Sequence, residues 1–193
     1  MPWEKSYKEA DVLERAMRAF WARGYAATSM NDLVEATGIN RGSIYTAFTN
    51  KHGLFMASLR RYDKIHRAGY LARVAGSHDP KEAIIAAFEQ AAKSSEETGY
   101  PGGCLLVNTA LELSPHEPDA REFVNGSLAE VERFFISRIE AAKQEGTISA
   151  SLASAETARA LLGLFIGLRV LMRTEPEGSA VKAITSQARA MLE

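Results

Sequence analysis

The feature that most constrains the fold of this chain is the segment 28–51, TSMNDLVEATGINRGSIYTAFTNK. Ser29 is a favoured helix N-cap, and Asp32 three residues later is the acid of a capping box. Gly38 follows an apolar helical repeat and ends that helix, because glycine adopts the left-handed conformation at the lowest cost. Asn40 then caps a second short helix. The segment therefore predicts two short helices joined by a tight turn.

The second short helix has two different faces. Ile39 before the cap and Ile44 inside the helix stand at the positions of a hydrophobic staple, and Ile44 and Phe48 are expected to face inward. The side chains expected to point outward are basic, small or hydroxyl-bearing, namely Arg41, Ser43, Tyr45 and Thr46. A short helix with such an outer face, braced by another helix, is typical of a helix-turn-helix DNA reader.

The rest of the chain is dominated by helical periodicity, with no alternating strand pattern. We expect an all-α fold of about nine helices. Besides the two short ones, these are predicted at about 7–23, 51–74, 80–98, 104–113, 118–145, 152–173 and 179–192. Asp79, Pro80 and Glu82 predict a second capping box after a break at 76–79. We expect a DNA-binding domain at 1–50 and a body at 51–193, linked by the helix that starts at residue 51.

Charge is distributed unevenly along the chain. Residues 1–75 hold 12 Lys/Arg and 7 Asp/Glu, whereas residues 76–193 hold 11 and 17. A positive N-terminal part on a negative body fits a chain whose first part alone meets a polyanion, although surface charge also varies without function.

The sequence offers little for metal, cofactor or membrane chemistry. Cys104 is the single cysteine and favours a reducing compartment. The four histidines show no ligand spacing with each other or with Cys104, so no metal and no cofactor are expected. The longest charge-free apolar run, 160–168, is too short to cross a bilayer. With no signal-peptide pattern at the start, we expect a cytoplasmic protein with no membrane partner.

The helix at 152–173 is apolar nearly all round, so it must be covered on more than one side. Together with the last helix it predicts a homodimer interface built as a four-helix bundle. Burial inside one subunit is the alternative. The interface candidates are Leu161, Gly163, Leu164, Gly167, Leu168, Leu171, Ile184 and Ala188.

The run FWARGYAATSMNDLVEATGINRGSIYTAFTNKHGLF resembles the TetR family of transcriptional regulators, most closely over residues 9–59. The resemblance implies an all-α dimer, an effector pocket inside the helices between 51 and 145, and repression that a ligand relieves. It implies base contacts by Arg41, Ser43 and Thr46, and phosphate contacts by Thr28, Tyr45 and Lys51, with Asn40 and Gly42 beside them. Thr46 and Ala47 stand where many members carry a large polar residue, so the base preference is not readable. A half-buried structural role is the alternative for Tyr45.

The segment YPGGCLLVN, 100–108, resembles the branch of the family that includes electrophile-sensing repressors. A thiol in the first turn of a helix is favoured as thiolate by the helix dipole. Cys104, Asn108 and Leu111 fall on one helical face and are expected to line a pocket. The other pocket candidates are Tyr62, His66, Phe88 and Phe134.

Alternatives stay open for the role of Cys104 and for the function of the chain. Cys104 is either a sensing thiol or a small buried core residue. A helical thiol enzyme using Cys104 lacks an evident base partner. A non-specific DNA architectural protein fits poorly with a short basic segment that also carries acids. The sequence thus predicts a dimeric, ligand-responsive repressor whose partners are operator DNA and a small-molecule effector.

Overall fold

The computed structural model describes residues 7–93, 97, 99–174 and 178–193. Over these residues the chain is helical and has no strand. The helices are α1 (Glu9–Arg23), α2 (Met30–Thr37), α3 (Arg41–Phe48), α4 (Lys51–Tyr62), η1 (Asp63–Ala68), α5 (Gly69–Ser77), α6 (Pro80–Ala91), α8 (Leu105–Glu112), α9 (Pro118–Gln144), α10 (Ser154–Leu171) and α11 (Gly178–Ala190). With α4, η1 and α5 counted as one rod, the described chain has nine helices, which confirms the predicted all-α architecture.

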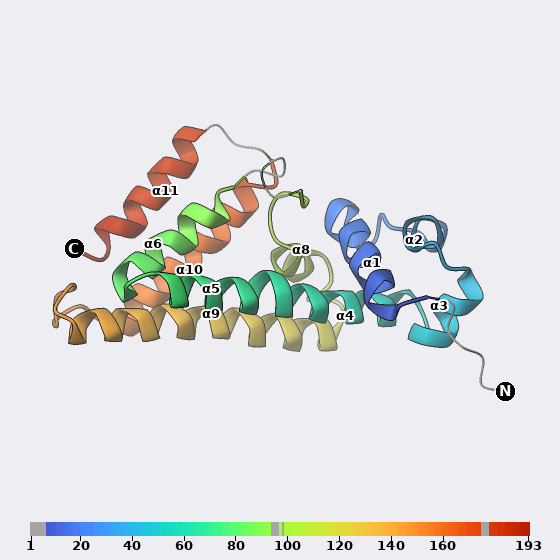
Figure 1. The fold of residues 1–193 in the computed structure, drawn as a ribbon, viewed down its shortest axis with the longest axis horizontal. Coiled ribbons are helices and arrows are strands. Elements are labelled where there is room, and N and C mark those ends of the chain that lie inside the picture. The colour runs from blue at the N-terminus through green and yellow to red at the C-terminus, as the bar shows by residue number, and fades with distance from the viewer. Residues whose placement is uncertain (1–6, 94–96, 98, 175–177) are drawn as a thin grey trace.

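Three regions of the molecule follow one another along its long axis (Figure 1). The head, formed by α1, α2 and α3, lies at one end. The body, with α6, α10 and α11, lies at the other end, and α8 lies between them. No helix among the described residues is long and apolar enough to cross a membrane.

The rod of α4, η1 and α5 connects head and body and is fastened to α9. His52 Nε2 lies 2.8 Å from Asp119 Oδ2, and Arg67 Nη2 lies 2.6 Å from Glu130 Oε2. The predicted helix at 51–74 is therefore present, but it extends to Ser77 and contains a π-helix. π-Helical turns are uncommon and often occur at functional sites. The apolar repeat did not predict this π-helix.

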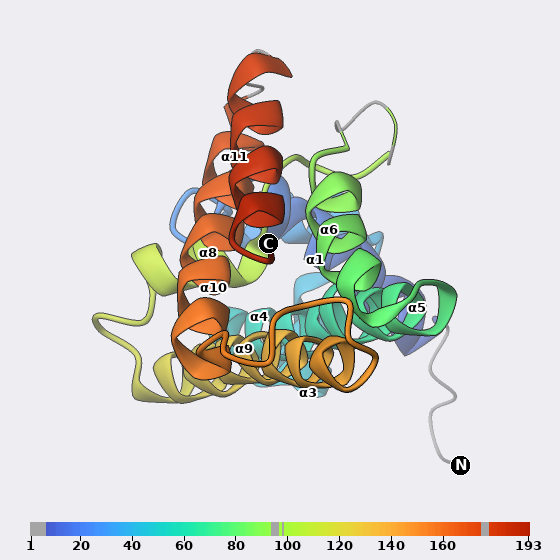
Figure 2. The same cartoon turned by 90° about the vertical axis from the view of Figure 1, so that its left-hand side faces the viewer.

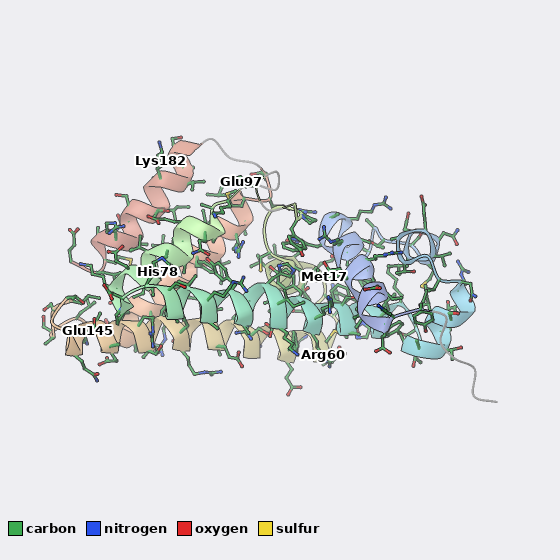
Figure 3. All side chains as sticks on the ribbon, in the orientation of Figure 1. Met17, Arg60, His78, Glu97, Glu145 and Lys182 are labelled. Carbon is green, nitrogen blue, oxygen red and sulfur yellow. The ribbon has the colours of Figure 1, made fainter. Side chains whose placement is uncertain are left out.

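Two apolar cores hold the molecule together. The body core joins α5, α6, α9, α10 and α11. The second core begins in the head around Phe20 and Leu33 and continues through α4 into Leu105 and Leu106 of α8. In the side-chain view, Met17 of this core lies where α1 meets α8 (Figure 3). This second core thus contains residues from both sides of position 50. We propose that residues 1–50 and 51–193 differ in their roles, DNA binding and ligand binding with dimerisation, although they share a core.

The start and end of α6 differ from the sequence prediction. Asp79 makes no side-chain cap, and Glu82 instead accepts a hydrogen bond of 3.2 Å from Arg189 of α11. The predicted second capping box is therefore wrong, because a partner distant in sequence occupies its acid. The helix ends at Ala91 rather than at about 98; residues 94–96 and 98 lie outside the described residues.

Candidate DNA-binding surface and effector cavity

The caps predicted for the head are present. The Ser29 hydroxyl accepts from Asp32 N at 3.1 Å, and Asp32 Oδ2 accepts from Ser29 N at 2.7 Å. Gly38 has φ of 74°, and Asn40 Oδ1 accepts from Ser43 N at 2.8 Å. These local bonds satisfy the first N–H groups of α2 and α3 and fix where each helix begins. The predicted helix-turn-helix is confirmed.

The outer face of α3 carries the side chains expected there. Arg41, Tyr45 and Thr46 are exposed, with Tyr45 at 46%, and Ser43 is half-buried. Arg41 Nη2 donates to Asn31 Oδ1 at 2.8 Å, which holds the guanidinium beside α2. Gly42 is exposed, so backbone lies at the surface between these side chains. Whether these groups contact DNA stays a prediction.

Two of the predicted phosphate contacts occupy different environments. Thr28 is fully buried, and its hydroxyl donates to Gly24 O at 2.6 Å. The hydroxyl thus supports the turn after α1, and the phosphate contact predicted for Thr28 stays a prediction. Lys51 is half-buried, with Nζ 4.3 Å from the centre of the Tyr25 ring. Burial is the main cause that lowers the pKa of Lys51.

The connection between α3 and α4 is a strained turn. Thr49 has φ of 70° and ψ of −48°, and Asn50 N donates to Phe48 O at 2.8 Å. This is a γ-turn with positive φ, a rare conformation that is unfavourable for a β-branched residue. The reading helix is thus joined to the rod by only two residues, Thr49 and Asn50.

The C-terminal end of α8 holds the head directly. The Glu112 carboxylate accepts from Tyr25 N at 2.9 Å and from Ala26 N at 2.6 Å. Both donors belong to the loop between α1 and α2. Charge-assisted hydrogen bonds of this kind are stronger than neutral ones. Sequence reasoning missed Glu112, because its partners lie more than 80 residues away in the chain.

The other end of α8 borders a small cavity of about 30 Å³, which is room for about one water molecule. Its lining includes Cys104, Leu106 and Val107 of the α8 region and, from other elements, Tyr62, His66, Arg67, Tyr70, Leu71, Leu128, Val131, Phe165, Ile166 and Arg169. The cavity lies between the rod, α8, α9 and α10.

A larger cleft of about 440 Å³ opens beside this cavity. Its lining comprises Trp21, Tyr62, Ile65, His66, Tyr70, Arg73, Gln90, Lys93, Glu97, Tyr100, Pro101, Gly102, Gly103 and Arg169. Tyr62, His66, Tyr70 and Arg169 belong to both linings and separate the two spaces. The labelled Glu97 lies on the segment between α6 and α8 (Figure 3).

Four rings meet at this wall. The His66 ring centre lies 5.2 Å from Trp21, 5.1 Å from Tyr62 and 4.4 Å from Tyr100. We call Trp21, Tyr62, His66 and Tyr100 the ring cluster. It joins α1 of the head to the rod and to the loop before α8 through packed rings.

Burial dominates the electrostatics of the wall. It lowers the pKa of His66 to about 4 and raises the pKa of Tyr70 to about 12. Burial and then the charge of Cys104 raise the pKa of Tyr62 well above its ordinary value. At neutral pH these three groups are uncharged, and Arg169 is the charged group they surround.

The predicted pocket residues separate into two groups. Tyr62, His66 and Cys104 line the small cavity, but Asn108 lines neither space and Leu111 is 73% exposed. The prediction that Cys104, Asn108 and Leu111 form one pocket face is therefore wrong. Cys104 has extended backbone, with φ of −146° and ψ of 124°, so the helical repeat starts only after it.

The two remaining pocket candidates pack in the body core. Phe88 is fully buried, and its ring centre lies 5.5 Å from that of Phe165. Phe134 is partly buried against the same core and its ring centre lies 5.5 Å from that of Phe135. Neither lines the small cavity or the cleft. Arg169, Tyr70 and Tyr100 were missed. The available signal for Arg169 was a charge that interrupts the apolar C-terminal half of α10.

The predicted interface residues also divide. Leu161, Leu168 and Ala188 are buried in the core of their own subunit, so their prediction as direct interface contacts is wrong. Gly163 is exposed, and Leu164, Gly167, Leu171 and Ile184 are half-buried. Val170, which the prediction omitted, is 43% exposed. Helices α10 and α11, which carry these residues, lie side by side (Figure 2).

His52, Glu117 and Asp119 place one possible ligand atom each within 4.8 Å of the others. His52 and Asp119 already contact each other at 2.8 Å, and Asp119 is exposed. The His52–Asp119 hydrogen bond joins α4 to α9.

A braced helix-turn-helix with an exposed polar face, on a helical body that contains a cavity, defines a DNA-binding regulator of the helix-turn-helix class. Two family models match the chain: "Bacterial regulatory proteins, tetR family" over residues 12–57, and "Tetracyclin repressor-like, C-terminal domain" over residues 80–188. The chain belongs to the TetR family and is a TetR-type DNA-binding transcriptional regulator.

The chain is similar to individual members of this family. The HTH-type transcriptional repressor ComR of Escherichia coli (strain K12) is 36% identical over 130 residues, which span 67% of this chain and 62% of ComR. A cysteine mutant of the TetR family regulator CifR, in complex with 26-bp double-strand operator DNA, is 26% identical, with a TM-score of 0.86 and 98% of both chains covered. Reduced E. coli NemR, 18% identical with a TM-score of 0.79 over 95% of this chain and 96% of NemR, shares the fold.

Proposed function

We propose that the chain is a ligand-responsive repressor that binds a near-palindromic operator as a homodimer and leaves it when a small-molecule effector binds. The observation that carries the proposal is the outer face of α3, where Arg41, Tyr45 and Thr46 are exposed on a helix with fixed caps. The operator complex of CifR supports the same mode of binding here. The relatives compared above are regulators, and we propose no enzymatic activity.

The proposed dimer uses the face of α10 that carries Gly163 and Gly167. A Cβ added at either glycine would meet nothing within 4 Å, so the face is open to a second helix. Exposed Val170 and half-buried Leu171 supply apolar surface beside it. A two-fold dimer would present two reading helices to two half-sites of one operator.

We propose that α8 transmits the effector signal. Cys104 precedes its first residue and borders the small cavity, whereas Glu112 at its end holds the loop after α1. A shift of α8 along its axis therefore changes both contacts together. The two heads of a dimer would change their separation and no longer fit both half-sites.

The operator test uses two substitutions. Arg41→Ala should relax sequence preference, because a guanidinium that reads a guanine edge contributes roughly 1–3 kcal/mol of discrimination. Lys51→Ala should weaken binding evenly across sequences and flatten its salt dependence. Arg133→Ala, an exposed change on α9, is the control. The measurement is fluorescence anisotropy against genomic operator fragments at several salt concentrations. Unchanged operator binding by both variants would overturn the proposal.

For the effector we propose an electrophile or oxidant that reacts at Cys104. With N-ethylmaleimide as the probe, the thiol sulfur would bond to one alkene carbon and the thiol proton would move to the other. The adduct is larger than a cavity of about 30 Å³ and would displace α8. Wild type should release operator DNA after treatment, and Cys104→Ser should retain it. Equal release by both would refute the role of Cys104 while leaving the repressor assignment intact.

A further inference from the structure

Three buried polar atoms without a hydrogen-bond partner come from residues that line the open cleft. They are Trp21 Nε1, His66 Nε2 and Arg169 Nε. The fourth such atom among the described residues, His52 Nδ1, belongs to a residue outside the cleft lining. Indole and guanidinium nitrogens only donate. Buried polar groups are normally paired, so it is unusual that residues of the cleft wall carry donors without an acceptor in the free protein.

Arg169 is the charged member of this set. Its guanidinium makes one long contact, 3.5 Å from Nη1 to Gly103 O, and lies 5.5 Å from the ring centre of Phe165. No carboxylate of the described residues lies within ion-pair distance of it. Arg67, on the neighbouring cavity, is in contrast held by both Asp63 and Glu130. A buried cation without a partner is costly, and an anion beside it removes that cost.

The remainder of the cleft fits the other parts of an organic acid. Its volume of about 440 Å³ is within the usual range for small-molecule sites. Trp21 and Tyr100 supply aromatic walls, with ring centres 5.6 Å apart. Arg73 and Lys93 line the exposed rim, where Glu97 is the one acid of the lining. One half-buried guanidinium without a carboxylate partner, aromatic walls and a basic rim suit a small molecule with one negative charge.

We propose that this cleft binds a small organic carboxylate whose oxygens accept hydrogen bonds from Arg169 and Trp21 and whose apolar part lies in the ring cluster. Trp21 belongs to α1 of the head, and Arg169 belongs to α10 of the body. The carboxylate therefore joins head and body through one group. Its effect on operator affinity rests on the proposed function; its binding does not.

The direct test follows the indole N–H signals in a ¹H–¹⁵N spectrum of the full chain. The sequence has two tryptophans, Trp3 and Trp21, and Trp21→Phe assigns both signals. Benzoate is the probe, and benzamide is the neutral molecule of the same shape. Benzoate should shift the Trp21 signal downfield in a saturable way and leave Trp3 in place, whereas benzamide should not. No shift with benzoate, or equal shifts with both, would overturn the proposal.

A second test removes the charge. Arg169→Gln should weaken benzoate binding by at least about tenfold in calorimetry, because it loses a charge-assisted pair. Arg133→Gln makes the same change in net charge at an exposed position of α9 and should bind benzoate as the wild type does. If Arg169→Gln does not fold by circular dichroism, Arg169→Lys is used, which keeps the charge and loses the planar fork. Wild-type benzoate affinity in the folded Arg169 variant would refute the site.

The two proposals fail in different ways. Operator binding is measured on the protein without added acid. If no operator is bound but the Trp21 signal still responds to benzoate, the repressor assignment is wrong and the cleft is right. If operator binding is intact and Trp21 does not respond, the cleft inference alone is wrong.

Discussion

The helix-turn-helix head and the cleft beside α8 satisfy their polar groups in opposite ways. In the head, each of the caps Ser29, Asn40 and Asn50 accepts from a backbone N–H three residues later. The cleft instead combines Trp21 with Arg169, which are far apart in the chain, and leaves polar atoms of both without partners. The caps of the head are thus satisfied by local bonds, whereas the cleft leaves donors for which we propose a ligand as the partner.

This difference separates the two tasks of a regulator. A reading surface must hold its side chains in fixed positions before DNA arrives, so local bonds that form with the helix are suitable. A sensing site must differ in energy between its free and bound states. In the proposed site, the unpaired donors of Trp21 and half-buried Arg169 would supply that difference. Glu112 connects the two regions and belongs to neither pattern, since it is distant in sequence but fully paired.

The largest effect is expected from the inward face of α3. Ile44→Ala should lower the free energy of unfolding by about 2–5 kcal/mol, because it empties a fully buried site. Its neighbour Tyr45 is 46% exposed, and Tyr45→Ala should change stability by no more than about 0.5 kcal/mol while weakening operator binding. Urea unfolding and operator anisotropy measure the two quantities. Similar losses of stability in both variants would contradict the assigned faces.

Glu112→Ala should have the next largest effect. It leaves Tyr25 N and Ala26 N without their carboxylate, and since water reaches Ala26 the expected loss is about 2 kcal/mol. The variant should also bind the operator more weakly, because the loop after α1 is released. Glu122→Ala, at an exposed position of α9, is the control and should match wild type in both measurements. A stable variant with normal operator affinity would show that α8 does not hold the head.

A smaller effect distinguishes the two capping patterns. Ser29→Ala should cost about 1 kcal/mol, the usual value for a lost N-cap. Asp79→Ala should cost at most a few tenths of a kcal/mol, because Asp79 makes no side-chain cap and only its charge near the helix start is lost. Thermal unfolding of both variants measures this. An equal cost at the two positions would mean that Asp79 caps α6 in solution.

These two positions also show what the sequence was able to predict. The capping box at Ser29 and Asp32 was readable because both partners lie within one helical turn. The same reasoning failed at Asp79 and Glu82, since Arg189 of α11 takes the acid. The local sequence pattern was therefore sufficient to predict the head, the helix order and the long helix 118–144. It was not sufficient where a residue distant in sequence competes for a hydrogen-bonding group.

The cleft was largely beyond sequence reasoning for the same reason. Tyr62, His66 and Cys104 were predicted near a pocket, but Trp21 and Arg169 were not. Their meeting depends on how α1, the rod and α10 pack together. The π-helix that carries His66 is equally a product of tertiary packing. The residues that remain without partners can only be found when all neighbours are known.

The smallest expected effect is a pH dependence of stability from His66. Burial lowers its pKa from the ordinary 6.5 to about 4 in the folded protein. Between these values the unfolded chain binds more protons, so the stabilisation from neutral His66 is complete above pH 6.5 and is lost as the pH falls toward 4. After allowance for solvent screening, the loss between pH 7 and 5.5 should be about 0.5 kcal/mol. His66→Gln has no titrating ring and should lose less stability than wild type over this interval, whereas His116→Gln, which replaces an exposed ring outside the cleft, should lose as much. Urea unfolding at both pH values measures the difference, and identical slopes for all three proteins would place His66 in a solvated setting rather than in the buried ring cluster.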